Sequence, residues 1–182
     1  MIETQTLIGE ISTENELKAN ISSDNLLIGE LGKTRIKPTP SYVSFARYGG
    51  ETLDVSWLDT SNMTDMSRMF ESCSNLLELN IRNFTSTNVN NMSRMFSGCS
   101  RLVTLNVKNL TSVSNGNYTN MFYSCSRVRT LYLNKFDFRN VSDANSMMNG
   151  IPKSTTTTIY VLDQYAKDTL EALNYRNVII AN

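Results

Sequence analysis

A period of 26 residues runs through the middle of this chain of 182 residues. The segment "DMSRMFESCSNLLELNIRNF" begins at residue 65, and its near copy "NMSRMFSGCSRLVTLNVKNL" begins at residue 91. Three of the apolar columns with this spacing are Phe70, Phe96 and Phe122; Cys73, Cys99 and Cys125; and Leu53, Leu79, Leu105 and Leu131. Because periods of about 20–50 residues are typical of repeat architectures, the repeat predicts a stack of similar coils.

The apolar spacing changes within each unit. Met66, Met69, Phe70 and Cys73 lie three or four residues apart, which predicts one buried stripe on a short helix. Residues 76–81, "LLELNI", then alternate in the manner of a strand buried on one side. One unit buries too little to be stable alone, so neighbouring units must share a core. The expected fold class is α/β, a right-handed leucine-rich-repeat-like solenoid of strand, turn and short helix.

The first 31 residues follow a shorter rhythm, in which "LIGEI" at 7–11 returns as "LIGEL" at 27–31. We interpret residues 1–31 as a small all-β segment for attachment and oligomerisation, followed by a linker at 32–41 that contains Pro38 and Pro40. The apolar residues assigned to this attachment role are Leu7, Ile11, Leu17, Ile21, Leu27 and Leu31. Such short strands bury little surface, so an oligomer or a docking partner is expected to support them.

The solenoid is expected to span residues 42–182. Its N-terminal cap is assigned to residues 42–52 and its repeats to residues 53–150. Residues 151–182 are predicted to form a closing strand, helix and strand, because "TTIYV", "DQYAKDTLEALNY" and "NVIIAN" follow one another there. Caps of this kind keep a stack of coils from polymerising at its ends.

The stretch "WLDTSNMTDMSRMFESCSNLLELNIRNFTSTNVNNMSRMFSGCSRLVTLNV" resembles the BspA-type leucine-rich repeats of bacterial surface proteins and some bacteriophage structural proteins. The resemblance covers residues 53–150. The L-x-G-x-I-S opening and the closing segment are also similar to those of phage virion proteins. Together, these resemblances imply a non-enzymatic protein and favour a trimer. Where ordinary leucine-rich repeats carry asparagine, this chain has Phe84, Leu110 and Phe136, so the usual asparagine ladder is not expected.

Composition argues against several other classes of protein. The 17 basic and 17 acidic residues cancel, so no general attraction to nucleic acid is expected. Histidine is absent, which removes the commonest general base and a frequent metal ligand. No phosphate-binding loop or nucleophile elbow occurs. We therefore expect no enzymatic activity, no cofactor, no metal and no insertion into a membrane, and we expect the three cysteines to be buried free thiols.

The outward positions of the strands are the candidate binding face, because solenoids present such rows as a flat array. The chosen residues are Asp54, Glu78, Asn80, Arg82, Asn106, Lys108, Tyr132 and Asn134. Amides, cations and an aromatic ring suit a glycan or a polar protein surface. A merely solvated sheet face is the alternative reading of the same residues.

These features favour a bacteriophage virion structural protein that displays a repeat module for adhesion to a host surface. Residues 1–31 would contact other virion proteins, and the repeat face would bind a host glycan or protein. The sequence begins without a signal peptide, which fits synthesis in the host cytoplasm and localisation in the virion. The alternative is an adhesin on the bacterial cell surface, or a protein–protein interaction module of the same repeat family.

Overall fold

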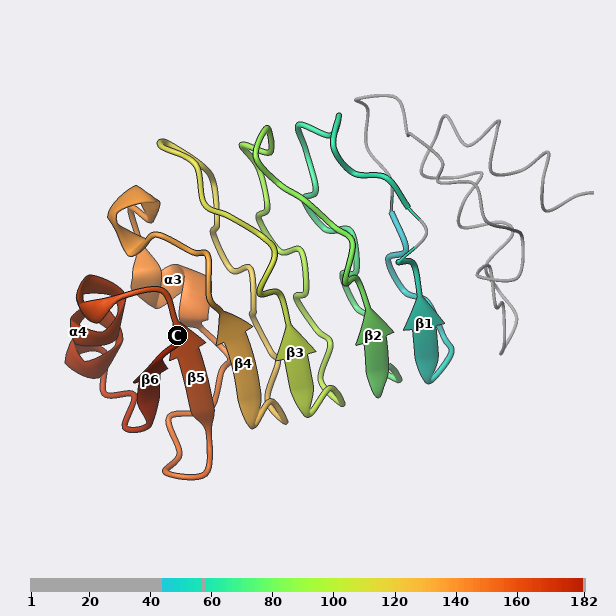
Figure 1. The fold of residues 1–182 in the computed structure, drawn as a ribbon. Helices are drawn as coiled ribbons and strands as arrows, with labels where there is room; N and C mark the ends of the chain where they lie inside the picture. Colours follow the sequence, from blue (N-terminus) through green and yellow to red (C-terminus); the bar gives the residue numbers. More distant parts are fainter. Residues whose placement is uncertain (1–43, 57, 182) are drawn as a thin grey trace, which may run out of the picture.

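A computed structural model describes residues 44–56 and 58–181. Figure 1 shows successive coils stacked side by side, with the strands aligned along one face. The strands are β1 (Thr52–Asp54), β2 (Glu78–Asn80), β3 (Thr104–Asn106), β4 (Thr130–Leu133), β5 (Thr158–Val161) and β6 (Val178–Ile180), and the helices are η2 (Phe138–Asn140), α3 (Ala144–Met148) and α4 (Gln164–Ala172). The attachment segment assigned to residues 1–31 and the linker at 32–41 lie outside the described residues.

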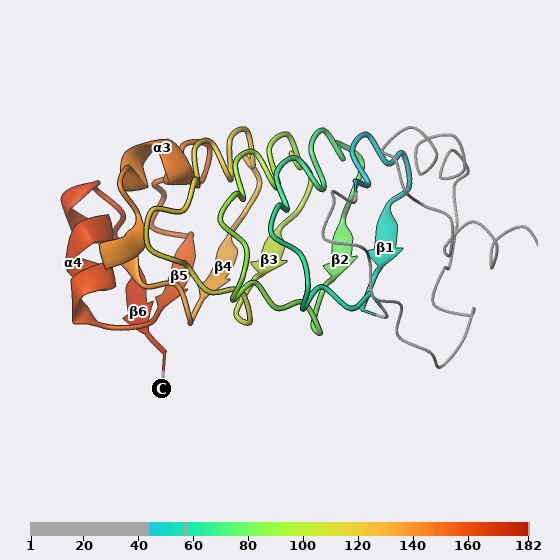
Figure 2. The ribbon, with the colours of Figure 1, turned by 90° about the horizontal axis from the view of Figure 1, so that it is seen from above.

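The strands pair in parallel, one coil apart. Leu53 lies opposite Leu79 in the β1–β2 pair, and Leu105 lies opposite Leu131 in the β3–β4 pair. Viewed from above in Figure 2, the strands follow one side of the stack and the returning turns follow the other. The prediction of a repeat solenoid is therefore confirmed.

The short helix predicted for each unit is wrong in the first three coils. Residues 66–73, 92–99 and 118–125 instead form arcs of consecutive turns. Their amides point along the stack: Phe70 donates its N–H to the carbonyl oxygen of Met95 at 2.8 Å, and Phe96 donates to Met121 at 3.0 Å. The same spacing of apolar residues fits this arc because the bonds run between coils and not along a helix. Among the described repeats, an α-helix occurs in the fourth unit, where α3 begins after Asp143.

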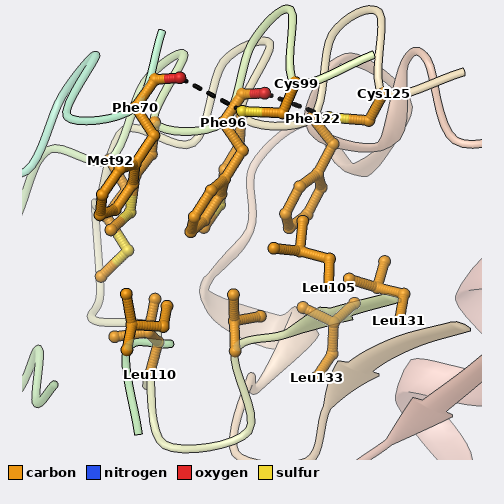
Figure 3. Packing of buried hydrophobic residues seen from close by; sticks show 14 of the residues in the cluster. Phe70, Met92, Phe96, Cys99, Leu105, Leu110, Phe122, Cys125, Leu131 and Leu133 are labelled. Carbon is orange, nitrogen blue, oxygen red and sulfur yellow. Dashed lines mark hydrogen bonds between the residues drawn. The ribbon is translucent and has the colours of Figure 1, made fainter. Parts of the chain in front are cut away.

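The apolar columns form one core between the arcs and the strands. The rings of Phe45, Phe70, Phe96 and Phe122 stack in sequence, with centroids 5.6, 5.6 and 5.9 Å apart. Figure 3 shows the rings of Phe70, Phe96 and Phe122 lying above strand leucines such as Leu105, Leu131 and Leu133. The stacking continues from coil to coil, so the core is shared by the whole repeat region.

The three cysteines are buried free thiols aligned along the arc side. Each one donates to the carbonyl oxygen of a phenylalanine in the preceding coil: Cys99 to Phe70 at 3.2 Å and Cys125 to Phe96 at 3.1 Å, as Figure 3 shows. Burial raises the pKa of the Cys125 thiol to about 12. The thiols therefore act as hydrogen-bond donors within the core.

A ladder of amide side chains joins the ends of the strands, at positions other than those of the usual asparagine ladder. Asn83 donates from Nδ2 to the carbonyl oxygen of Ser56 at 2.7 Å, and Asn109 donates to that of Arg82 at 2.7 Å. These asparagines stand one residue before Phe84 and Leu110, so the ladder is shifted by one position from the usual repeat.

The end of the stack is closed by β5, α4 and β6. The carboxylate of Asp163 accepts from the amide of Ala166 at the start of α4 and from Arg139 Nη1 at 2.8 Å. The hydroxyl of Tyr175 donates to the carbonyl oxygen of Met148 at 3.0 Å. In the part of the chain that the structure describes, no helix is both long and apolar enough to cross a membrane.

Candidate functional site

The strand face is interrupted between β2 and β3. β1 pairs with β2, and β3, β4, β5 and β6 form a second continuous sheet, but within residues 44–56 and 58–181 β2 and β3 are not paired. Figure 1 shows the wider spacing between these two strands. On the arc side the same two coils remain joined, since Ser72 donates its amide to Ser97 at 2.7 Å. The coils thus separate only along their strands.

A groove of about 570 Å³ lies at this interruption. Its volume falls within the range of about 300–1,000 Å³ that is usual for ligand sites. Six of the eight residues predicted for the binding face line it: Asp54, Glu78, Asn80, Arg82, Asn106 and Lys108. Leu79, Ile81, Val107 and Leu110 supply its apolar lining. Polar side chains from β1, β2 and β3 therefore gather around an apolar floor.

The polar side chains of the groove are held by short local contacts. Asp54 accepts the amide of Ser56 at 2.9 Å and Nδ2 of Asn80 at 2.9 Å. Partial burial opposes ionisation of this carboxyl, but the hydrogen bonds from Ser56 and Asn80, together with the charge of Arg82, lower its pKa below the ordinary value. Asp54 is consequently an anion at neutral pH.

The two cations of the groove are exposed, and they follow the carboxyl ends of their strands. Arg82 follows β2 and Lys108 follows β3 at the equivalent position. Neither forms an ion pair with a described residue, whereas Arg94 and Arg101 pair with Glu71 and Glu51. Arg82 and Lys108 can therefore bind an anionic group of a ligand without breaking an existing ion pair.

Tyr132 and Asn134 lie apart from the groove, on and just after β4. The ring of Tyr132 stacks on that of Tyr160 from β5, with centroids 4.7 Å apart and planes within 7°. The rings face one another, so this pair exposes less ring face than a lone tyrosine. Asn134 is half-buried, and its Oδ1 has no hydrogen-bond partner in the described residues.

Sequence reasoning missed Tyr160 and the apolar floor. The segment "TTIYV" places Tyr160 in register with Tyr132, so the strand prediction could have found it. The floor could not be found in this way because Leu79 occupies the same column as buried leucines. Leu79 is half-buried, whereas Leu53 and Leu105 are 3% and 1% exposed, which marks the opening.

The described residues offer no candidate metal-binding site. Within residues 44–56 and 58–181, no group of three or more Cys, Asp or Glu side chains could hold a metal ion. The three aligned thiols are occupied as donors to backbone carbonyl groups. The groove is therefore the site with the most features of a ligand-binding surface.

Comparison with known proteins identifies a family but no activity. Among curated proteins and among solved structures, no match was found. Residues 42–159 match a family described as "Mycoplasma protein of unknown function, DUF285", and the matched region spans β1 to the start of β5. This match fits the BspA-type repeat pattern of the sequence. The chain belongs to the DUF285 family.

Proposed function

We propose that this protein is a non-enzymatic recognition module whose strand face binds a host-surface glycan or protein. The observation that carries the proposal is the groove between β2 and β3, which gathers six of the predicted face residues above an apolar floor. A solvated sheet face does not require such a hollow, nor two exposed cations without ion-pair partners among the described residues. Binding through preformed strands needs little rearrangement of the backbone.

The setting we favour for this module is a bacteriophage virion. The resemblance of the L-x-G-x-I-S opening and of the closing segment to phage virion proteins supports this setting. Residues 1–31 would then attach the protein to the particle, and a homo-oligomer would multiply the weak contacts of single faces. A bacterial cell-surface adhesin of the same repeat type is the alternative setting.

The recognition role is tested by removing the two cations of the groove, Arg82 and Lys108. We expect the double variant Arg82→Ala and Lys108→Ala to reduce adsorption to host cells about tenfold or more, since charged contacts at an interface govern encounter and retention. The matched control is Arg127→Ala with Arg176→Ala, which removes the same charge from exposed positions outside the groove. Both double variants should keep the melting temperature of the parent protein. Equal adsorption by the two would overturn the assignment of this face.

The virion setting has its own test. Particles are purified and probed for the protein with an antibody, and then the protein is replaced by a variant that begins at Thr39. We expect the full chain to co-purify with particles and the shortened chain to be lost from them. Incorporation of the shortened chain would contradict the attachment role of residues 1–31, and absence of the full chain from particles would favour the adhesin setting.

A further inference from the structure

We propose that the groove between β2 and β3 binds an extended peptide segment of a protein partner, which enters parallel to both strands and joins the two sheets into one. This inference rests on the proposed recognition function and deepens it by naming the class of ligand. It follows from the backbone of the groove, from the way its two sides are joined, and from the charges along its rim.

The backbone edges that face the groove lack the hydrogen bonds made at the other junctions. The amide of Val55 donates to the carbonyl oxygen of Asn80 at 3.1 Å, and the amide of Val107 donates to that of Tyr132 at 3.2 Å. Ile81 occupies the equivalent position at the end of β2, yet its amide has no partner among the described residues. A polypeptide in extended conformation supplies donors and acceptors at the spacing of such an edge, which a glycan does not.

The arc side lets the groove open without unfolding the coils. Across the same junction, Arg68 donates its amide to Ser93 at 2.9 Å, Phe70 to Met95 at 2.8 Å, and Ser72 to Ser97 at 2.7 Å. A complete inserted strand needs β2 and β3 about 9–10 Å apart, which is two strand spacings. The arc can serve as the hinge for this widening: its backbone hydrogen bonds and stacked rings stay in place, and the Asn109–Arg82 bond at the end of the groove is given up.

Side chains of the groove define the sequence that would fit. In a parallel insertion, one outward residue of the peptide lies between Arg82 and Lys108, where the carboxylate of an Asp or Glu would be attracted to both cations. The preceding outward residue lies between Asn80 and Asn106 and is expected to be a small polar residue. The inward residues contact the floor around Leu79 and are expected to be apolar. The predicted ligand is therefore a five-residue pattern of polar, apolar, polar, apolar and acidic residues.

Peptide binding by the full chain tests this pattern. The probe is a fluorescein-labelled peptide with Ser-Leu-Thr-Val-Glu at its centre, and fluorescence anisotropy measures its dissociation constant. We expect saturable binding that weakens on the order of tenfold or more in the charge-reversed variant Arg82→Glu with Lys108→Glu. A peptide with Lys in place of the Glu of this central pattern should regain affinity for the charge-reversed variant. The control Arg127→Glu with Arg176→Glu should bind as the parent does.

A reversible clamp tests insertion as opposed to binding on the surface. Cysteines at Asn80→Cys and Asn106→Cys can form a disulfide only if β2 and β3 approach to about 4.4–6.8 Å between Cα atoms, which closes the groove. We expect the oxidised variant to lose peptide binding and the reduced variant to regain it. The control Thr130→Cys with Thr158→Cys lies across the paired β4–β5 junction and outside the groove, so its oxidation should leave binding in place. Equal binding by the oxidised and reduced clamp would overturn the inference.

The outcomes separate this inference from the proposed function. Peptide binding that depends on Arg82 and Lys108, together with unchanged adsorption of their alanine variant to cells, supports the peptide site and contradicts the adhesion role. Loss of adsorption without any peptide binding supports the recognition role and overturns the peptide assignment in favour of a glycan.

Discussion

The two sides of the same coil junction are held very differently. On the arc side, the coils that carry β2 and β3 are joined by backbone hydrogen bonds of 2.7–2.9 Å and by the stacked rings of Phe70 and Phe96. On the strand side, β2 and β3 are unpaired, and the carbonyl oxygen of Arg82 accepts one side-chain bond from Asn109. The stack therefore remains continuous even where its sheet is not.

This difference shows which part of the repeat provides cohesion. β2 and β3 contain three residues each, so a ladder between them would contribute few hydrogen bonds. The arc combines bonds with the burial of large aromatic rings, and burial of apolar area is the dominant stabilising term in folding. A solenoid built in this way can give up one strand pairing to create a binding site, because its core does not depend on that pairing.

The largest expected effect breaks the arc side. Phe96→Ala removes a fully buried ring between Phe70 and Phe122, and we expect it to lower the free energy of unfolding by about 3–5 kcal/mol. Urea denaturation followed by circular dichroism measures the change. Tyr132→Ala is the control from the strand side, where removal of a half-buried ring should cost much less. A loss equal to that of Phe96→Ala would contradict the view that the arc provides most of the cohesion.

High pH should also lower the free energy of unfolding through the arc side, by somewhat less than Phe96→Ala does. The pKa of Cys125 is raised by burial to about 12 in the folded chain, above the ordinary value of 9.0 that applies after unfolding. As the pH rises, the thiol loses its proton in the unfolded state before it does so in the folded state. Its contribution to the free energy of unfolding is therefore fully present below pH 9 and is lost as the pH rises toward 12. By pH 11 the loss from this thiol would be about 2–3 kcal/mol, at about 1.4 kcal/mol per pKa unit.

The measurement is the midpoint of urea denaturation at several pH values between 8 and 11. Burial raises the pKa of Tyr175 to about 12 as well, so part of the decline above pH 10 belongs to that hydroxyl. Cys125→Ala should reduce the part that begins near pH 9, to which Cys99 also contributes because its hydrogen bond with Cys73 and its burial raise its pKa. Tyr175→Phe should reduce the part that begins near pH 10, to which Tyr118 also contributes because burial raises its pKa. An unchanged pH dependence in Cys125→Ala would show that the thiol is accessible to ionisation in the folded chain.

The sequence predicted the arc side and the strand side with unequal success. The columns of Phe70 and Cys73 identified the stacking and the buried thiols because each coil repeats the same packing. The same columns wrongly suggested short helices, since residues three or four apart also share a face on an arc of turns. Leu79 and Leu105 give no sign of the interruption, because identical columns predict identical pairing. Six of the outward residues nonetheless line the same groove, since alternation alone fixes the outward face of each strand.

A smaller effect is expected from the amide ladder. Asn109→Ala removes the bond to Arg82 beside the groove, and Asn83→Ala removes the corresponding bond to Ser56 beside the paired β1–β2 junction. Each change should lower the free energy of unfolding by about 0.5–1.5 kcal/mol, as for a typical hydrogen bond. Urea denaturation compares the two. A loss of several kcal/mol in Asn109→Ala alone would show that the groove side carries more of the stability than its geometry indicates.

The smallest change in energy, and the sharpest contrast, is expected in hydrogen exchange of single amides. The amides of Val55 and Val107 donate across coil junctions, but the amide of Ile81 has no such partner among the described residues. Ile81 should therefore exchange much faster than the other two, because little free energy is needed to expose an amide without a partner. Exchange followed by nuclear magnetic resonance resolves the three residues.

Burial alone could slow the exchange of Ile81, whose side chain is 4% exposed, so the comparison needs a closed reference. The oxidised variant with Asn80→Cys and Asn106→Cys brings β2 and β3 together and lets the amide of Ile81 donate to the carbonyl oxygen at position 106. If the groove is open in solution, closure should slow Ile81 to the rate of Val107 while leaving Val55 unchanged. Equal exchange rates for Ile81 before and after closure would mean that burial protects this amide. The edges of β2 and β3 would then not be open for pairing with an inserted strand.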